Sequence, residues 1–190
     1  MRIGILSDTH QPLDQKTIWD EIHVAFAGVD LILHSGDIVS RKILDQLQVI
    51  APVLAARGNH DFDWDDERME DVQWVEAEGR RIGMTHAIEP EDRPIEVLRD
   101  LYFAGQPIDI MISGDSHIER MDYRDGVLQI NPGSPTLPHH QSTRLGSVAL
   151  LEIEGDRLEA RIIRLGEHAG KPNPCREFHF TPETGVVRLG

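Results

Sequence analysis

Residues 31–61 read LILHSGDIVSRKILDQLQVIAPVLAARGNHD. Two short apolar runs, 31–34 and 52–56, have the length of buried strands, and polar residues follow each of them. The apolar residues between them recur at helical spacing after Ser40, a candidate N-cap. This strand–helix–strand order predicts two parallel strands joined by a right-handed crossover. The polar residues after both strands are therefore expected at one edge of a sheet.

The same pattern extends to the N-terminal side and changes on the C-terminal side. A third apolar run covers residues 2–7, and helical spacing covers about 16–27. Later segments instead form pairs of strand-like runs around short turns, which is typical of hairpins. Two sheets packed face to face, with helices outside, would accommodate both halves. The expected later elements are hairpins over 72–85, 119–131 and 147–165, a strand over 108–113, and a short helix opened by Pro94 with Ile95, Leu98 and Leu101 on one side.

The chain is expected to form one domain over residues 1–165, followed by a C-terminal extension over 166–190. Glycine and proline interrupt the pattern in the extension. We expect it to pack on the same domain or to be partly extended, with 177–180 as a candidate edge strand.

Composition excludes several classes of protein. The net charge of −14 disfavours binding to long nucleic acids. The single cysteine, Cys175, excludes an internal disulfide and a thiolate-rich metal site. There is no apolar stretch long enough to cross a bilayer, so we expect no membrane association and a cytoplasmic location. Any bound metal would need nitrogen and oxygen ligands.

Five of the predicted strands end in side chains that bind metals. In open α/β sheets, sites form where the carboxyl ends of parallel strands converge. Each tip taken alone has an ordinary explanation as a turn, a helix cap or a surface histidine. Five such strand ends together favour a metal centre, and one with two ions is expected. The candidate residues are Asp8, His10, Asp37, Asn59, His60, Asp61, His86, Asp115 and His117.

The order and spacing of these tips resemble the calcineurin-like metallophosphoesterase superfamily. The matching segments are Asp8-x-His10, Gly36-Asp37, Gly58-Asn59-His60-Asp61, His86 and Gly114-x-x-His117. The segment Asn131-Pro132-Gly133-Ser134 is similar to one in the compact YfcE-like phosphodiesterase branch. The resemblance covers about the first 135 residues. It implies a four-layer α/β/β/α sandwich of two mixed sheets flanked by helices.

The resemblance also implies a cofactor of two divalent metal ions. Manganese is the first expectation, with iron, nickel, zinc or magnesium as alternatives. One ion would be held by Asp8, His10, Asp37 and His117, and Asp37 would bridge to a second ion held with Asn59 and His86. The implied reaction is in-line attack on phosphorus by a hydroxide that bridges the ions. His60 would protonate the leaving oxygen or stabilise the transition state, and Asp61 is a candidate for orienting His60.

One position departs from the family pattern. The family has Gly-His-x-His where this chain has Gly114-Asp115-Ser116-His117. Aspartate binds the same metals but prefers harder ions such as Mn²⁺ or Mg²⁺. We expect Asp115 to ligate the second ion; the alternative is that its side chain turns away and the second site is weak or empty.

Two hypotheses for function follow. The first is a metal-dependent phosphoesterase acting on small phosphate esters, with phosphodiesters favoured over phosphomonoesters. The second is a binding or scaffold module of the same fold with little or no catalysis, for which Asp115 is the motivating residue. The sequence leaves open a homo-oligomer and does not identify the substrate.

Four other residues have two interpretations each. His34 precedes the Asp37 segment and is expected to support the site rather than to ligate metal. Arg57 could reach a phosphate or pair with nearby carboxylates. His139 and His140 could line a substrate entrance or belong to a solvated loop.

Overall fold

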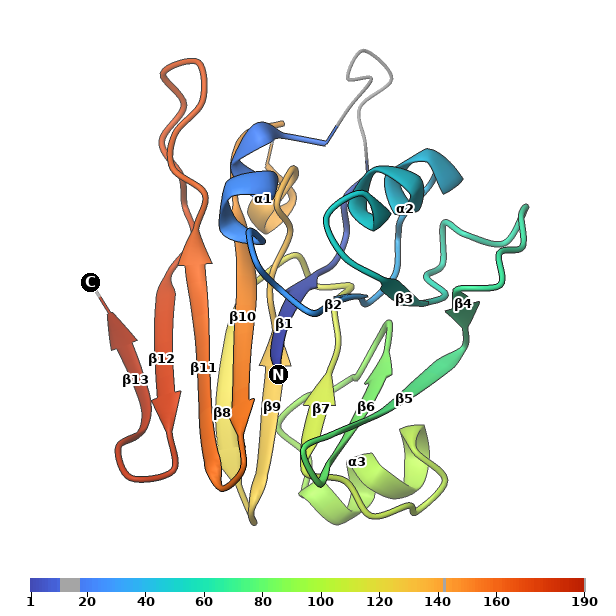
Figure 1. The fold of residues 1–190 in the computed structure, drawn as a ribbon, viewed down its shortest axis with the longest axis vertical. Coiled ribbons are helices and arrows are strands. Elements are labelled where there is room, and N and C mark those ends of the chain that lie inside the picture. The colour runs from blue at the N-terminus through green and yellow to red at the C-terminus, as the bar shows by residue number, and fades with distance from the viewer. Residues whose placement is uncertain (11–17, 142, 190) are drawn as a thin grey trace.

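The computed structural model describes residues 1–10, 18–141 and 143–189. Their strands form two mixed sheets, as expected (Figure 1). The larger sheet has the order β13-β12-β11-β10-β1-β2-β3-β4, and the smaller one has the order β5-β6-β7-β9-β8. In the larger sheet the strands are β1 (Arg2–Leu6), β2 (Leu31–His34), β3 (Val53–Ala56), β4 (Met69–Glu70), β10 (Ser147–Glu154), β11 (Arg157–Arg164), β12 (Glu177–Thr181) and β13 (Gly185–Leu189). In the smaller sheet they are β5 (Val72–Ala77), β6 (Arg80–Thr85), β7 (Ile110–Ile112), β8 (Arg120–Arg124) and β9 (Val127–Asn131).

The first three strands pair in parallel, as the sequence predicts. Strands β1, β2 and β3 pair in parallel, with Leu6 opposite His34 and His34 opposite Ala55. Strands β6 and β7 are also parallel, whereas the predicted hairpins β5–β6, β8–β9 and β10–β11 are antiparallel. The parallel strands of each sheet therefore end at a common edge.

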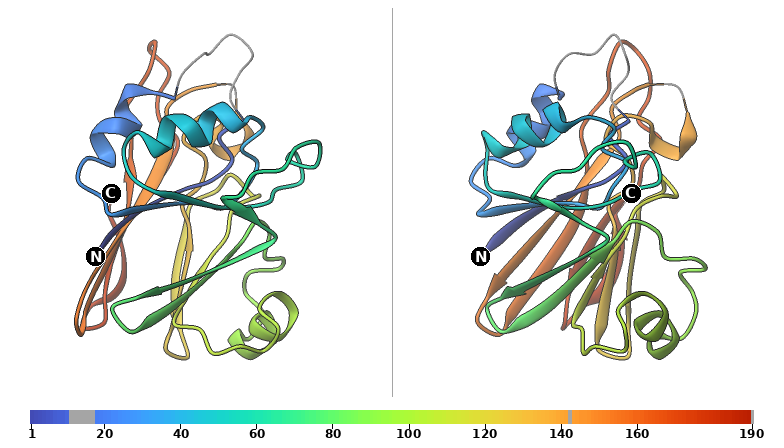
Figure 2. Two further views of the ribbon diagram at one scale, coloured as in Figure 1. Left: turned by 45° about the vertical axis from the view of Figure 1, so that its right-hand side comes forward. Right: turned by 90° about the vertical axis from the view of Figure 1, so that its right-hand side faces the viewer.

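The helices complete a four-layer α/β/β/α arrangement (Figure 2). Helices α1 (Asp20–Ala25) and α2 (Arg41–Gln48) pack on the outer face of the larger sheet. Helix α3 (Ile95–Tyr102) packs on the outer face of the smaller sheet. A 3-10 turn, η1 (Pro138–His140), lies between β9 and β10. No helix within the described residues is long and apolar enough to span a lipid bilayer.

Successive side chains of β1 point alternately into two different layers of the fold. Ile3 and Ile5 point into the apolar layer between the two sheets. Leu6 points to the opposite side, under α1 and α2. Gly4 also faces that side, where a Cβ atom would lie 2.8 Å from the ring of Phe26. The missing side chain lets this aromatic ring lie directly on the strand.

Several expectations about individual elements were wrong. Leu101 of α3 is 57% exposed, whereas Ile95 and Leu98, which were expected on the same side of the helix, are buried. Each residue turns an α-helix by about 100°, so Leu101 lies about 120° away from Ile95 around the axis. Phe103, just beyond the helix, fills the apolar layer instead.

The strand boundaries also differ from the expected ones. Strand β7 is shorter than the expected 108–113, and the sequence did not predict β4 or β13. Helix α1 covers only part of the expected range 16–27, of which residues 16 and 17 lie outside the described residues.

Candidate metal centre

The candidate site lies at the carboxyl ends of five parallel strands. Asp8 and His10 follow β1, Asp37 follows β2, and His86 follows β6. Residues 59–61 follow β3, and residues 115–117 follow β7. The two sheets contribute to the same site because bonds join them there: Ser35 Oγ donates to the carbonyl of Ser113 (3.1 Å).

Backbone conformation aims these side chains at a common centre. Asp8, Asp37, Asp115 and His117 all have φ between 54° and 67°, in the left-handed region. His10 has φ of 30°. Such conformations cost free energy in residues other than glycine, and they cluster at functional sites.

Two glycines allow the loops to approach closely enough. A Cβ atom on Gly58 would lie 2.1 Å from the backbone nitrogen of Asp37. A Cβ atom on Gly114 would lie 1.8 Å from Ser7 Oγ and 2.8 Å from Asp8 Oδ2. No other residue type fits at either position without moving a candidate ligand.

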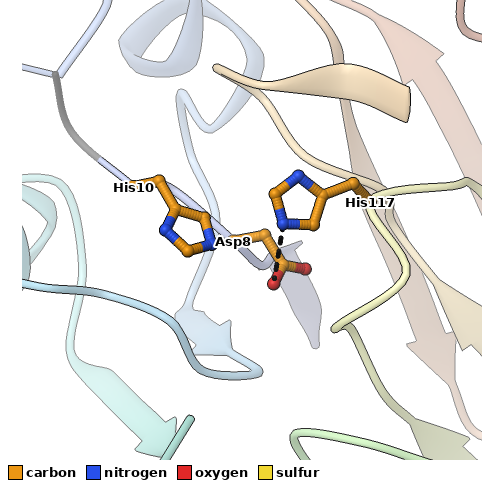
Figure 3. A group of neighbouring side chains, drawn as sticks. All are labelled: Asp8, His10 and His117. Carbon is orange, nitrogen blue, oxygen red and sulfur yellow. Dashed lines mark ion pairs between the residues drawn. The ribbon is translucent and has the colours of Figure 1, made fainter. Parts of the chain in front are cut away.

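The first group of candidate ligands consists of Asp8, His10 and His117 (Figure 3). Nε2 of His117 lies 3.6 Å from Oδ1 of Asp8. Nδ1 of His117 is 2.8 Å from the carbonyl of Leu137, to which it donates in the tautomer that leaves Nε2 free to bind a metal. Asp115 contributes its backbone N–H to Oδ2 of Asp8 (3.0 Å).

The second group forms around Asp37 and His86. Nε2 of His86 lies 3.4 Å from Oδ1 of Asp37 and 3.3 Å from Oδ1 of Asp115. It also lies 2.9 Å from Oδ1 of Asn59. Nδ1 of His86 is 2.7 Å from the carbonyl of Ser35, which again leaves Nε2 for the centre.

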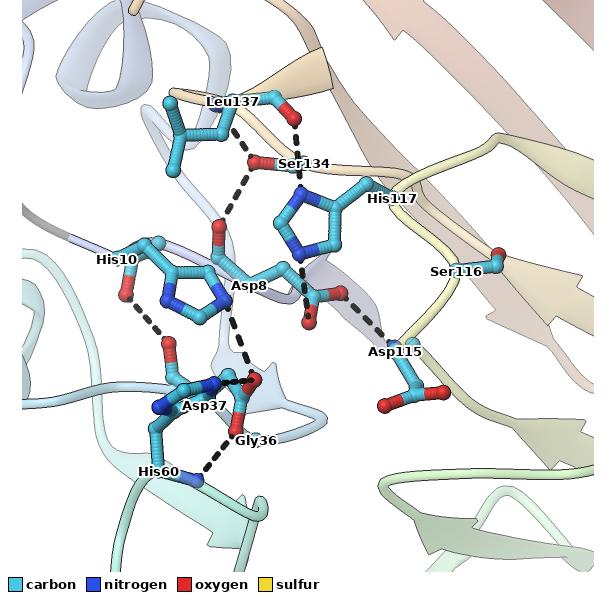
Figure 4. A network of polar contacts seen from close by, with 12 residues as sticks. Asp8, His10, Gly36, Asp37, His60, Asp115, Ser116, His117, Ser134 and Leu137 are labelled. Atoms are coloured by element: carbon cyan, nitrogen blue, oxygen red, sulfur yellow. Dashed lines mark hydrogen bonds and ion pairs between the residues drawn. The ribbon is translucent and has the colours of Figure 1, made fainter. Parts of the chain in front are cut away.

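Asp37 contacts both groups, and Figure 4 shows its carboxylate beside His10 and His60. Its Oδ2 is 3.1 Å from Nε2 of His10, and its Oδ1 faces His86. Its Oδ1 also accepts the backbone N–H of His60 (2.9 Å). The carboxylate thus has one oxygen toward each group, which is the arrangement a bridging ligand needs.

The pKa values of these side chains reflect burial and mutual contact. Burial raises the pKa of Asp8 to about 7, although His86 opposes the shift. Burial alone would raise the pKa of Asp37, but hydrogen bonds from His10 and His86 hold it well below its usual range. Burial opposes protonation of His86, but Asp37 and Asp8 raise its pKa to about 9. Burial lowers the pKa of His117 to about 4.

The donor set fits divalent metal ions. The buried Oδ1 of Asp8 has no hydrogen-bond partner among the described residues. A buried polar atom without a partner is costly, and a bound cation would satisfy it. All the donors are imidazole nitrogens and carboxylate or amide oxygens, which suit Mn²⁺, Fe²⁺ and Zn²⁺.

His60 and Asp61 occupy different environments. The His60 side chain is 57% exposed, and its Nε2 lies 3.9 Å from Oδ2 of Asp37. Asp61 is fully buried, and its carboxylate accepts backbone N–H groups from Gly58 (2.9 Å), Ile38 (3.1 Å) and Val39 (2.8 Å). These bonds tie the turn after β3 to the turn after β2.

Sequence reasoning did not assign a role to the segment 131–137, which braces the ligand loops. Asn131 donates to the carbonyl of Gly114 (2.9 Å), and Ser134 Oγ donates to the carbonyl of Asp8 (2.7 Å). The Asn-Pro-Gly-Ser motif pointed to this segment without indicating what it contacts. His34 supports the site as expected, because its ring contacts Thr9 Oγ1 (3.2 Å) and the backbone nitrogen of Gly36 (3.2 Å).

Arg57 pairs with a nearby carboxylate, which is the second of its two interpretations. Its Nη2 bonds to Asp65 (2.8 Å), and its Nη1 donates to the carbonyls of Asp61 and Trp64 (3.0 Å each). The guanidinium therefore holds the loop after β3.

The fold and the clusters of candidate metal ligands together define the architecture of a metal-dependent phosphoesterase. The family sequence model for the calcineurin-like phosphoesterase superfamily domain matches residues 1–156, and the chain belongs to this superfamily. Its clusters of aspartate and histidine are consistent with a centre of two metal ions.

Individual relatives agree with this assignment. The chain is 35% identical over 182 residues to a probable metallophosphoesterase of Methanothermobacter thermautotrophicus, covering 95% of this chain and 99% of that protein. It is 28% identical over 145 residues to a phosphodiesterase of Methanocaldococcus jannaschii, covering 70% of this chain and 83% of that protein. Among solved structures, Vps29 of Entamoeba histolytica complexed with zinc has a TM-score of 0.71 at 21% identity, with 100% of both chains covered. This last likeness concerns the fold alone.

Proposed function

We propose that this chain hydrolyses small phosphate esters, with phosphodiesters preferred to phosphomonoesters, at a centre of two divalent cations. The position of Asp37 is the observation that carries this proposal. Its two carboxylate oxygens face His10 on one side and His86 on the other. A buried carboxylate shared in this way is suited to hold two cations close together despite their repulsion.

In this proposal the two ions share Asp37 and otherwise have different ligands. Asp8, His10, Asp37 and His117 hold the first ion. Asp37, Asn59, His86 and Asp115 hold the second. When bound, two such ions lower the pKa of a water molecule and neutralise charge on a phosphate. Manganese is the first choice, because Asp115 adds a hard oxygen donor to the second set.

His60 is the proposed proton donor to the leaving oxygen. Its exposed ring lies beside Asp37, where it can reach a substrate bound from the solvent side. Asp61 is assigned to positioning, because its three backbone contacts fix the turn that carries His60.

The test compares His60→Ala with the original protein, each stripped of metal and then supplied with Mn²⁺. Glycerophosphocholine and glycerol 3-phosphate, whose alkoxide leaving groups need a proton, serve as the diester and the monoester. We expect His60→Ala to lower turnover of the diester by about 10²–10⁴-fold, because it removes general acid catalysis, and to leave metal content unchanged. His23→Ala is the matched control, since His23 is an exposed histidine on α1.

Two outcomes contradict the proposal. One is a metal-replete protein that leaves both esters intact, which would favour a binding or scaffold module. The other is unchanged turnover in His60→Ala, which would remove the assigned proton donor.

A further inference from the structure

A short turn that packs against His117 makes a set of contacts that the proposed reaction does not explain. This histidine turn comprises Leu137 and η1 (Pro138–His140). The carbonyl of Leu137 accepts a bond from Nδ1 of His117, and the backbone N–H of His139 donates to the carbonyl of His117 (2.9 Å). The ring of His140 stacks on the ring of His117 with centroids 4.1 Å apart. One turn thus contacts both the backbone and the ring of a proposed ligand.

The histidine turn has a strained backbone. His139 and His140 have φ of 53° and 55°, so two consecutive non-glycine residues adopt the left-handed conformation. Such a conformation persists only where surrounding contacts determine it. Something must therefore hold the turn in place.

A buried carboxylate provides that anchor. Glu119 is 2% exposed, and its Oε2 lies 2.8 Å from Nε2 of His139. Its Oε1 accepts the backbone N–H of Arg176 (2.8 Å), so both oxygens are used. The contacts of Glu119 with His139 and Arg176 form a clasp. Because Arg176 belongs to the C-terminal extension, the clasp also joins this extension to the segment that carries His117.

Cys175 lies close enough to Glu119 and His139 for the three to be considered as metal ligands. Two observations favour a hydrogen-bonded clasp over a metal site. The separation of 2.8 Å between Glu119 and His139 is that of a charge-assisted hydrogen bond. Burial also raises the pKa of the Cys175 thiol to about 12, which opposes the thiolate that a metal requires.

We infer that Glu119 and His139 are positioning residues that hold the histidine turn, and through it the ring of His117, in the orientation for metal binding. The inference rests on the proposed function, because it assigns His117 to the first ion. The clasp acts by keeping the Leu137 carbonyl in place, which holds the proton of His117 on Nδ1 and leaves Nε2 free.

The first readout is the tautomer of His117 in the metal-free protein, observed by long-range proton–nitrogen NMR of the imidazole rings. We expect one tautomer, with the proton on Nδ1, in the original protein and a mixture in His139→Ala. The second readout is Mn²⁺ affinity by calorimetry, where His139→Ala should weaken the first equivalent by about tenfold. His139→Gln, whose amide can still donate to Glu119, should restore both.

The matched control is His179→Ala. His179 and Glu159 form a similar pair (3.1 Å) between β12 and β11. Loss of that pair should leave both readouts unchanged, even where it lowers stability. Glu119→Gln, which removes one of the two acceptors, provides a second variant and should change both readouts in the same direction as His139→Ala.

Three outcomes separate this inference from the proposed function. An unchanged tautomer and unchanged Mn²⁺ affinity in His139→Ala would overturn the clasp and leave the proposed function intact. A tautomer that depends on His139 in a protein that binds no metal would support the clasp and contradict the proposed function. A further equivalent of Zn²⁺ that is lost in Cys175→Ser would overturn the clasp in favour of a separate metal site.

Discussion

Asp115 places a carboxylate at a position where the family pattern has an imidazole. Its Oδ1 lies 3.3 Å from Nε2 of His86, and its side chain is one-third exposed. An oxygen donor favours harder cations, and its charge lowers the net positive charge available to a substrate phosphate. The second ion of the centre is therefore expected to bind less tightly to zinc here than with histidine.

Asp115→His should tighten the second equivalent of Zn²⁺. Imidazole is a better ligand than carboxylate for this borderline ion, and we expect a gain of about tenfold, or about 1.4 kcal/mol. Calorimetric titration of the metal-free protein measures it. Asp125→His is the matched control, since Asp125 also has positive φ (51°) but lies in the β8–β9 turn. Equal affinity in Asp115→His and the original protein would show that this side chain is no ligand.

At the scale of elements, an ion-pair network fixes the loop that leads from β3 to β4. Asp66 accepts two bonds of 2.7 Å from the guanidinium of Arg68, and Arg41 of α2 lies 3.2 Å away. Hydrogen bonds from Arg68 lower the pKa of Asp66 to about 2. The ionised form of Asp66 therefore stabilises the fold at pH values above its unfolded-state pKa of about 3.9.

Asp66→Asn should lower the free energy of unfolding by about 1 kcal/mol at pH 7. The effect is no larger because solvent screens an ion-pair network that is partly exposed. The folded pKa is the lower one, so the contribution is lost as pH falls from about 4 to about 2. Urea denaturation at pH 7 and pH 3 measures the difference, with Asp63→Asn, at an exposed position, as the control. A difference that is equal at both pH values would contradict the electrostatic explanation.

The elements that the sequence predicted well are those with a strong local signal. Strand β2 and helix α2 follow from their apolar spacing, and Ser40 caps α2 by accepting the N–H of Lys42. Strand β4 has two residues, too few for a period to be visible. Strand β13 is partly exposed along its length, so it lacks the apolar pattern of a core strand.

The ligand candidates were visible in the sequence because metal-binding side chains at strand ends have no packing role. Their supports were not visible. The carbonyls of Ser35 and Leu137, which face His86 and His117, belong to the backbone and carry no residue-type signal. The pairing of Glu119 with His139 depends on tertiary structure, because 20 residues separate them along the chain.

For the whole molecule, three apolar layers hold the four structural layers together. The central one lies between the sheets, and the other two lie under the helices. Both sheets must stay in contact for the site to exist, because β1 to β3 carry some ligands and β6 and β7 carry the others. The central layer is therefore expected to determine both stability and metal binding.

Leu33→Ala tests the contribution of the central layer to stability. Leu33 is fully buried between the sheets, and its truncation should cost about 3 kcal/mol of unfolding free energy, since it leaves a cavity. Leu101→Ala is the control, because Leu101 is 57% exposed on α3 and should change stability by less than about 0.5 kcal/mol. Chemical denaturation measures both, and equal costs would contradict the layered core.

The central claim is a centre of two metal ions with Asp37 between them. Anomalous diffraction from crystals loaded with Mn²⁺, recorded on both sides of the manganese absorption edge, tests it directly. The prediction is two peaks about 3.5–4 Å apart, one contacting Asp8, His10 and His117 and the other contacting Asn59, His86 and Asp115. A single peak, or a second peak that Asp37 does not contact, would contradict the proposed centre.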